Sequence, residues 1–70
     1  MIKWSTVESS NLSMVGYDAE KLELRIKFNS GTEYAYLGVP SEVFDGLMRA
    51  PSAGKFLARE IKGKYEYHQV

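Results

Sequence analysis

The chain has 70 residues, enough for one small domain, and its nine Lys and Arg side chains balance nine Asp and Glu. A domain of this size buries only about 60% of the surface that its unfolded chain exposes, so its core is small. With no cysteine and a single histidine, His68, disulfide bonds and thiolate metal sites are excluded and a metal site is not expected. Self-association is the remaining route to extra stability, so we also expect that the protein can form a homo-oligomer.

The first residues contain no apolar run long enough for a signal peptide or a membrane span. We therefore expect a cytoplasmic protein without a membrane partner, in keeping with the absence of cysteine. Residues 2–7 predict a short strand with Trp4 packed against the sheet. Residues 11–18 predict a second strand with Leu12 and Met14 on one side.

Residues 21–28 carry the clearest strand pattern, because apolar and charged residues alternate along the whole segment. This period of two is typical of a half-buried strand. Residues 29–31, Asn-Ser-Gly, predict a turn, and residues 32–37 return as the partner strand.

After Pro40, which suits the first turn of a helix, the apolar spacing becomes helical. The predicted apolar stripe consists of Val43, Phe44, Leu47 and Met48. Gly46 weakens this helix by about 1 kcal/mol relative to alanine, so we expect a short helix. Pro51 ends it, because the residue before a proline is pushed out of the helical region.

A second helix is predicted with Ser52 as its N-cap and Gly63 at its end. Its buried side would consist of Ala53, Phe56, Leu57 and Ile61. Residues 64–69 alternate again and predict an edge strand. The sequence thus predicts one α+β domain over residues 1–70, a small antiparallel meander of three to five strands with two short helices packed on one face.

The order of these motifs resembles the KTSC domain, a family named for its occurrence at the C-terminus of some lysyl-tRNA synthetases. The pair Tyr34 and Tyr36 stands at the centre of the match. The other matching positions are Gly16, Tyr17, Leu24, Phe28, Gly31, Val39, Pro40, Ala50, Ser52, Gly54, Phe56 and Ile61. The resemblance covers nearly the whole chain and implies no established catalytic residues. The placement of the family on a synthetase suggests nucleic-acid binding, by analogy.

The face on which Tyr34 and Tyr36 lie depends on the turn before them. A two-residue turn would set them opposite the basic residues of the preceding strand, outside the core, as a platform on which bases stack. A three-residue turn over residues 29–31 would set them opposite Ile26 and Leu24, within the core. Glycine at the last position of a three-residue loop favours the second arrangement, and both tyrosines are kept as candidate stacking residues.

Positive charge gathers in residues 49–64, which hold five basic residues and one acid, whereas residues 1–48 hold four basic residues and seven acids. Such asymmetry marks either a patch for an anionic partner or a solvated helix face. At the start of the second predicted helix, Ser52, Gly54 and Lys55 bring a hydroxyl, backbone N–H groups and an ammonium together, a combination that can bind phosphate.

Three further cations follow this candidate phosphate site: Arg59, Lys62 and Lys64. Because Lys55, Arg59 and Lys62 recur at spacings of four and three, they would line one exposed helix face. In the alternative interpretation, Ser52 only caps the helix, Gly54 allows close packing and the cations are merely solvated.

Enzymatic chemistry is not expected. A P-loop needs glycine five residues before Gly54 and Ser or Thr after Lys55, where the chain has Arg49 and Phe56. No nucleophile, base and orienting group are recognisable in the sequence, and no cofactor is expected.

The leading hypothesis is a small non-enzymatic module that binds nucleic acid, RNA rather than DNA, with modest and salt-sensitive affinity. A second hypothesis is an oligomer that binds and sequesters a small nucleotide, as a phage protein acting against host defence would. A third is a protein-interaction domain that uses exposed apolar helix surface.

Overall fold

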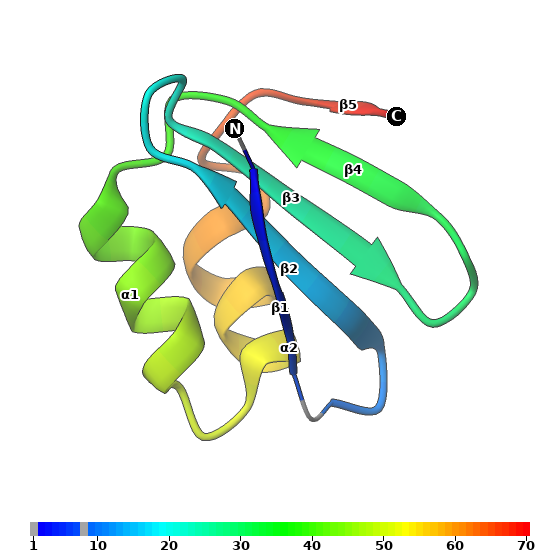
Figure 1. Cartoon of the computed structure of the whole chain (residues 1–70). Helices are drawn as coiled ribbons and strands as arrows, with labels where there is room; N and C mark the ends of the chain where they lie inside the picture. The colour runs from blue at the N-terminus through cyan, green and yellow to red at the C-terminus, as the bar shows by residue number, and fades with distance from the viewer. Residues whose placement is uncertain (1, 8) are drawn as a thin grey trace.

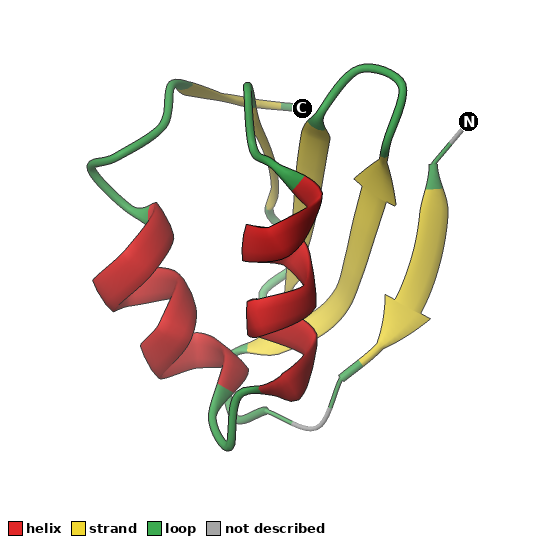
Figure 2. Ribbon diagram, turned by 90° about the vertical axis from the view of Figure 1, so that its left-hand side faces the viewer, coloured by secondary structure: helices red, strands yellow, loops and turns green. Residues whose placement is uncertain are grey.

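A computed structural model describes residues 2–7 and 9–70 and shows an antiparallel sheet with its helices on one face (Figures 1 and 2). Five strands lie side by side in chain order: β1 (Lys3–Thr6), β2 (Leu12–Asp18), β3 (Glu23–Phe28), β4 (Glu33–Tyr36) and β5 (Tyr67–Gln69). The predicted α+β meander is confirmed, with β5 added beside β4 after the chain has passed through the helices.

The β3–β4 hairpin closes through a three-residue loop. The N–H of Phe28 donates to the carbonyl of Thr32 at 2.8 Å, and the N–H of Gly31 donates back to Phe28 at 2.9 Å. Gly31 has a φ of 96°, a conformation that glycine adopts without strain. This loop pairs Ile26 with Tyr34 and Leu24 with Tyr36, the register that turn chemistry favoured.

Both tyrosine rings therefore turn toward the helices. Tyr36 is only 2% exposed and belongs to the core, whereas Tyr34 is half-buried. The alternative platform, with both rings outside among basic side chains, is not formed. With 2% of its surface exposed, Tyr36 offers little ring area on which a base could stack, whereas part of the Tyr34 ring stays accessible.

The prediction that Leu12 and Met14 lie on one side of their strand is wrong. Between these two residues the pairing of β2 with β3 shifts, because Leu12 lies opposite Phe28 while Met14 lies opposite Lys27. Such a bulge adds one residue to one strand and thereby exchanges the faces of the residues that follow. Leu12 is buried under the helices, and Met14 is half-buried on the other side of the sheet.

The first helix, α1 (Ser41–Arg49), begins directly after Pro40 as predicted. It ends at Ala50, whose extended backbone, with ψ at 141°, is the conformation expected before a proline. Of the predicted apolar stripe only Leu47 is fully buried, and Met48 is exposed. The helix thus lies at the edge of the core.

Gly46 marks the point where the two helices approach each other. A Cβ at this position would lie 2.9 Å from Cζ of the Phe56 ring, closer than side chains normally pack. The glycine that weakens α1 in isolation therefore makes room for the second helix, α2 (Ala53–Phe56), which continues as a π-helical turn, η1 (Leu57–Ile61).

The core fills the space between sheet and helices. Its most deeply buried side chains come from the sheet, the β4–α1 connection and the helices: Leu12, Val15, Leu24, Ile26, Tyr36, Val39, Leu47, Leu57 and Ile61. Tyr17 also belongs to this core, and its hydroxyl donates to the carbonyl of Val39 at 2.6 Å. Its ring stacks on Phe44 with the centroids 4.7 Å apart. Tyr17 thereby ties β2 to the connection and to α1.

Replacing Tyr17 by phenylalanine should lower the free energy of unfolding by about 1–3 kcal/mol, because the buried carbonyl of Val39 loses its donor. Urea denaturation measures this loss. Tyr36→Phe is the matched control, since the Tyr36 hydroxyl makes no hydrogen bond within residues 2–7 and 9–70. Equal losses in the two variants would contradict the role of the Tyr17 hydrogen bond.

Alkaline pH should destabilise the fold through the same two rings. Burial raises the pKa of Tyr36 above its ordinary value of about 10, and burial together with Glu42 and Asp45 raises that of Tyr17. Both phenols stay protonated in the folded chain where the unfolded chain already ionises. The free energy of unfolding is therefore highest below about pH 10 and falls as the pH rises through the folded-state pKa values.

Urea midpoints measured from pH 8 to 11, alongside the absorbance of ionised tyrosine, check this dependence. Tyr17→Phe should flatten it, and a constant midpoint across the range would contradict it.

Candidate functional site

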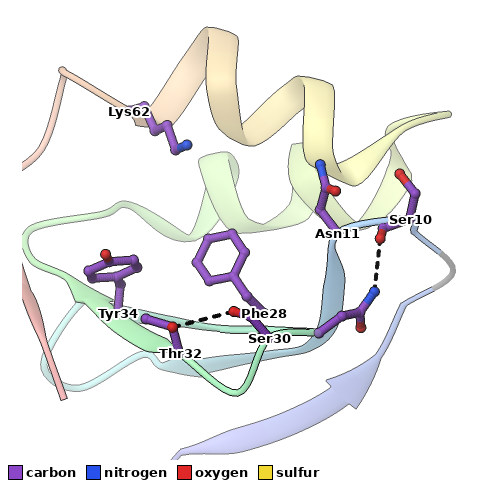
Figure 3. Close-up of a pocket in the computed structure, with 8 residues that line it drawn as sticks. Ser10, Asn11, Phe28, Ser30, Thr32, Tyr34 and Lys62 are labelled. Atoms are coloured by element: carbon purple, nitrogen blue, oxygen red, sulfur yellow. Dashed lines mark hydrogen bonds between the residues drawn. The ribbon is translucent and has the colours of Figure 1, made fainter.

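A groove runs between the second helical segment and the β3–β4 hairpin, on the helix side of the sheet. Its central hollow, of about 390 Å³, is lined by Ser10, Asn11, Phe28, Asn29, Ser30, Thr32, Tyr34 and Lys62 (Figure 3). A second hollow, at the helix start, shares Ser10 and Asn11 with it and adds Ser9, Pro51, Ser52, Gly54, Lys55 and Ala58. A third hollow shares Tyr34 and Lys62 and adds Tyr36, Gly63 and Tyr67. The three adjoining hollows form one continuous groove.

Two aromatic rings form the floor of the central hollow. Phe28 and Tyr34 rise from the neighbouring strands β3 and β4 and meet edge to face, with centroids 5.7 Å apart and planes at 80°. Tyr34 in turn meets the ring of Tyr67 on β5 at 5.5 Å. Since both floor rings also pack against the buried core, the fold holds them in place.

Lys62 reaches over this floor from the helix side (Figure 3). The expected single face shared by Lys55, Arg59 and Lys62 does not form, because the spacing argument assumed a regular α-helix. The N–H of Lys62 donates to the carbonyl of Leu57, five residues back, at 2.9 Å, and the backbone of Lys62 is extended with ψ at 130°. The π-helical turn and this extended residue direct Lys62 into the groove.

The helix start has the predicted cap. The Ser52 hydroxyl accepts the N–H of Lys55 at 3.3 Å, and the Lys55 side chain is exposed at the second hollow. Gly54 is not required for close packing. A Cβ there would lie 3.5 Å from the Ser9 hydroxyl and 3.8 Å from the Asn11 amide, which is ordinary contact.

The four candidate cations divide into two pairs. Arg59 and Lys64 both contact Glu60, at 3.2 Å and 3.8 Å. Within the described part of the chain, Lys55 and Lys62 have no carboxylate partner, and no Asp or Glu lines any of the three hollows. Among the described residues the groove thus presents two ammonium groups without a carboxylate partner, whereas Arg59 and Lys64 share one carboxylate, which offsets one of their two charges.

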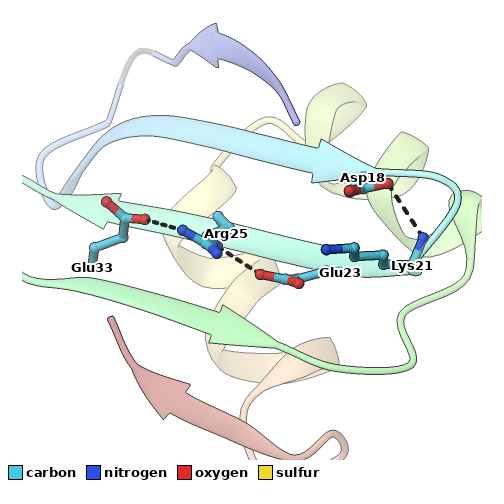
Figure 4. Close-up of polar contacts among 5 residues, drawn as sticks. All are labelled: Asp18, Lys21, Glu23, Arg25 and Glu33. Atoms are coloured by element: carbon cyan, nitrogen blue, oxygen red, sulfur yellow. Dashed lines mark hydrogen bonds and ion pairs between the residues drawn. The ribbon is translucent and has the colours of Figure 1, made fainter. Parts of the chain in front are cut away.

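The opposite face of the sheet is electrostatically different (Figure 4). Arg25 lies between Glu23 and Glu33, at 2.6 Å and 3.0 Å, and these two hydrogen bonds raise the pKa of Arg25. Asp18 accepts the backbone N–H groups of Glu20 and Lys21 and so stabilises the β2–β3 turn. These groups have structural partners, whereas Lys27, on the same face as Arg25, lies 5.8 Å from the Trp4 ring centroid and has no carboxylate partner among the described residues.

Among residues 2–7 and 9–70, no three His, Cys, Asp or Glu side chains are grouped as a metal ion would require. In the same residues we find no helix with the length and apolarity needed to cross a membrane.

Sequence reasoning missed Asn11 and Phe28 as site residues. Phe28 was assigned to the core because it alternates with charged residues, and Asn11 stood at a strand start with no local signal for binding. Asn11 and Lys62 are far apart in the chain and come to line the same hollow only in the folded structure.

Comparison with known proteins gives a consistent result. The family profile described as KTSC domain matches residues 8–65. A protein of Tsukamurella paurometabola is 41% identical over 59 residues, which are 84% of this chain and 88% of that protein. The lysine–tRNA ligase of Nostoc punctiforme is 36% identical over 63 residues, which are 90% of this chain but only 11% of the ligase. The crystal structure of a KTSC domain protein from Yersinia pestis superimposes with a TM-score of 0.96 at 34% identity, covering 100% of this chain and 99% of the other.

The two helical glycines should respond in opposite ways to alanine. Gly54→Ala should keep or raise the free energy of unfolding, by up to about 1 kcal/mol, because alanine favours the helix and the added methyl fits. Gly46→Ala gains the same helix preference but must displace the Phe56 ring, so it should be the less stable of the two variants. Thermal unfolding of both proteins measures the difference, and a less stable Gly54→Ala would contradict it.

Proposed function

The chain belongs to the KTSC domain family, and we propose that this member is a small non-enzymatic module that binds RNA along the groove. The charge of the groove carries the proposal. Lys55 and Lys62 line it without carboxylate partners in the described part of the chain, and two aromatic rings, Phe28 and Tyr34, line the central hollow together with Lys62. Cations that follow a backbone beside rings that stack on bases are typical of single-strand binding sites.

Each of the two lysines would neutralise a phosphate. Lys55 lies in the first turn of the second helical segment and Lys62 directly follows its end, so one strand would have to run along the groove to meet both. At the helix start the Ser52 hydroxyl accepts from Lys55 and keeps its own hydrogen for a phosphate oxygen, beside the N–H of Gly54. Arg59 and Lys64 would contribute less, because Glu60 contacts both.

The family context favours RNA as the ligand. A segment similar to this chain occurs within the lysine–tRNA ligase of Nostoc punctiforme, a protein whose name states that it acts on a tRNA. We extend this association to the present chain, together with a place in the cytoplasm. Sequestration of a small nucleotide by an oligomer uses the same groove chemistry and is the competing possibility.

Fluorescence anisotropy with a labelled single-stranded RNA tests the proposal. Two to four phosphate contacts predict that log K falls with log salt concentration with a slope of about −1.4 to −2.8. Lys62→Gln should weaken binding and reduce the slope by about 0.7, the value for one phosphate on a single strand. Lys55→Gln should act in the same direction.

Arg59→Gln is the matched control, because it also removes one exposed positive charge but from a side chain that already contacts Glu60. An equal loss in Arg59→Gln and Lys62→Gln would mean that only net charge matters. The absence of RNA binding would refute the proposal, and a saturable complex of a multimer with a nucleotide would favour sequestration.

A further inference from the structure

We infer that the central hollow accepts one unpaired nucleobase, so that the module recognises single-stranded RNA or free nucleotides and not a duplex. The inference rests on the proposed function and names the part of the ligand that this hollow takes. Its volume of about 390 Å³ lies within the range of small-ligand pockets, about 300–1,000 Å³. Stacked and paired bases inside a duplex could not enter it.

The floor of the hollow suits a flat aromatic ligand. Phe28 and Tyr34 are half-buried, so each ring is anchored in the core while part of it stays accessible. Because the two rings meet edge to face at 80°, a base can stack on the face of one ring and contact the edge of the other. Because the rings are already held in place, little conformational freedom is lost on binding.

The polar groups of the hollow fall into two sets. The Asn29 amide donates to the carbonyl of Ser10 at 2.9 Å, and the Ser30 hydroxyl donates to the Thr32 hydroxyl at 3.3 Å, so these groups already have partners within the protein (Figure 3). The Asn11 amide, the Tyr34 hydroxyl and the Lys62 ammonium make no hydrogen bond or ion pair within the described residues. The second set is free to bind a ligand.

The free groups match the parts of a nucleotide. The Asn11 amide presents a donor and an acceptor side by side, the pattern that pairs with N6 and N7 of adenine. The Lys62 ammonium, above the aromatic floor, would take the phosphate attached to a base stacked below it. None of the described residues that line the hollow is an Asp or a Glu, so none of them would repel an anion. An unpaired base that presents a donor beside an acceptor therefore fits these groups together with its phosphate, and the two-ring system of adenine covers more of the aromatic floor than a pyrimidine does.

Amide NMR titrations test the inference with four probes: single-stranded hexa-adenylate, hexa-uridylate, a short RNA duplex and AMP. Hexa-adenylate should shift the signals of Asn11, Phe28, Tyr34 and Lys62 and bind more tightly than the other RNAs. The duplex should leave the first three signals unchanged. If AMP shifts the same signals only at a higher concentration than hexa-adenylate, the natural ligand is a base within a strand. If AMP and hexa-adenylate bind with equal affinity, the natural ligand is a free nucleotide.

Two variants test the contacts to the base separately from the contacts to the phosphate. Asn11→Ala, at an exposed position, should weaken hexa-adenylate binding about fivefold or more and affect hexa-uridylate less. Tyr34→Leu should weaken both RNAs by a similar factor through lost stacking. Tyr65→Leu is the matched control, because Tyr65 packs against the core and lines none of the three hollows.

The outcomes separate this inference from the proposed function. If the duplex binds as well as the single strand, and Asn11→Ala and Tyr34→Leu bind like the parent protein while Lys62→Gln does not, the base pocket is refuted and RNA binding stands. If AMP fills the hollow and no RNA binds, the pocket stands and the RNA proposal fails. Silence from all four probes refutes both.

Discussion

The register of the β3–β4 hairpin is the constraint on which the groove depends. Gly31 has a positive φ and closes a three-residue loop. With a two-residue loop, every residue of β4 would be shifted by one position against β3 and would face the opposite side of the sheet. Tyr34 and Tyr36 then face the helices, while Glu33 faces the other side and pairs with Arg25. A slip of one residue would bury these charges and expose the core rings.

The same register divides the tyrosine pair between two tasks. Tyr36, opposite Leu24, is covered by the helical layer and is part of the core. Tyr34 lies nearer the hairpin end, which extends beyond the helices in Figure 1, and its half-buried ring reaches the groove. The buried residues around Tyr34 thus hold its ring in place. The ring stays accessible because the helices do not cover the end of the hairpin.

Charge separates the groove from the rest of the surface more than composition suggests. The chain has no net charge, yet three of its nine acids lie against cations outside the groove: Glu60 against Arg59 and Lys64, and Glu23 and Glu33 against Arg25. The π-helical turn at the end of the second helix places Lys62 in the lining of the groove. A protein without net charge can in this way present a locally positive groove. The positive potential of the groove favours the approach of an anionic strand.

The sequence by itself determined what depends on near neighbours: the alternation of β3, the starts and ends of both helices, the Ser52 cap and the family. The tertiary structure alone decided what depends on contacts between distant residues. These are the bulge that separates Leu12 from Met14, the approach of Phe56 to Gly46, and the placement of Asn11 and Lys62 in the lining of one hollow. Local propensity cannot fix such contacts, because their geometry exists only after sheet and helices have packed together.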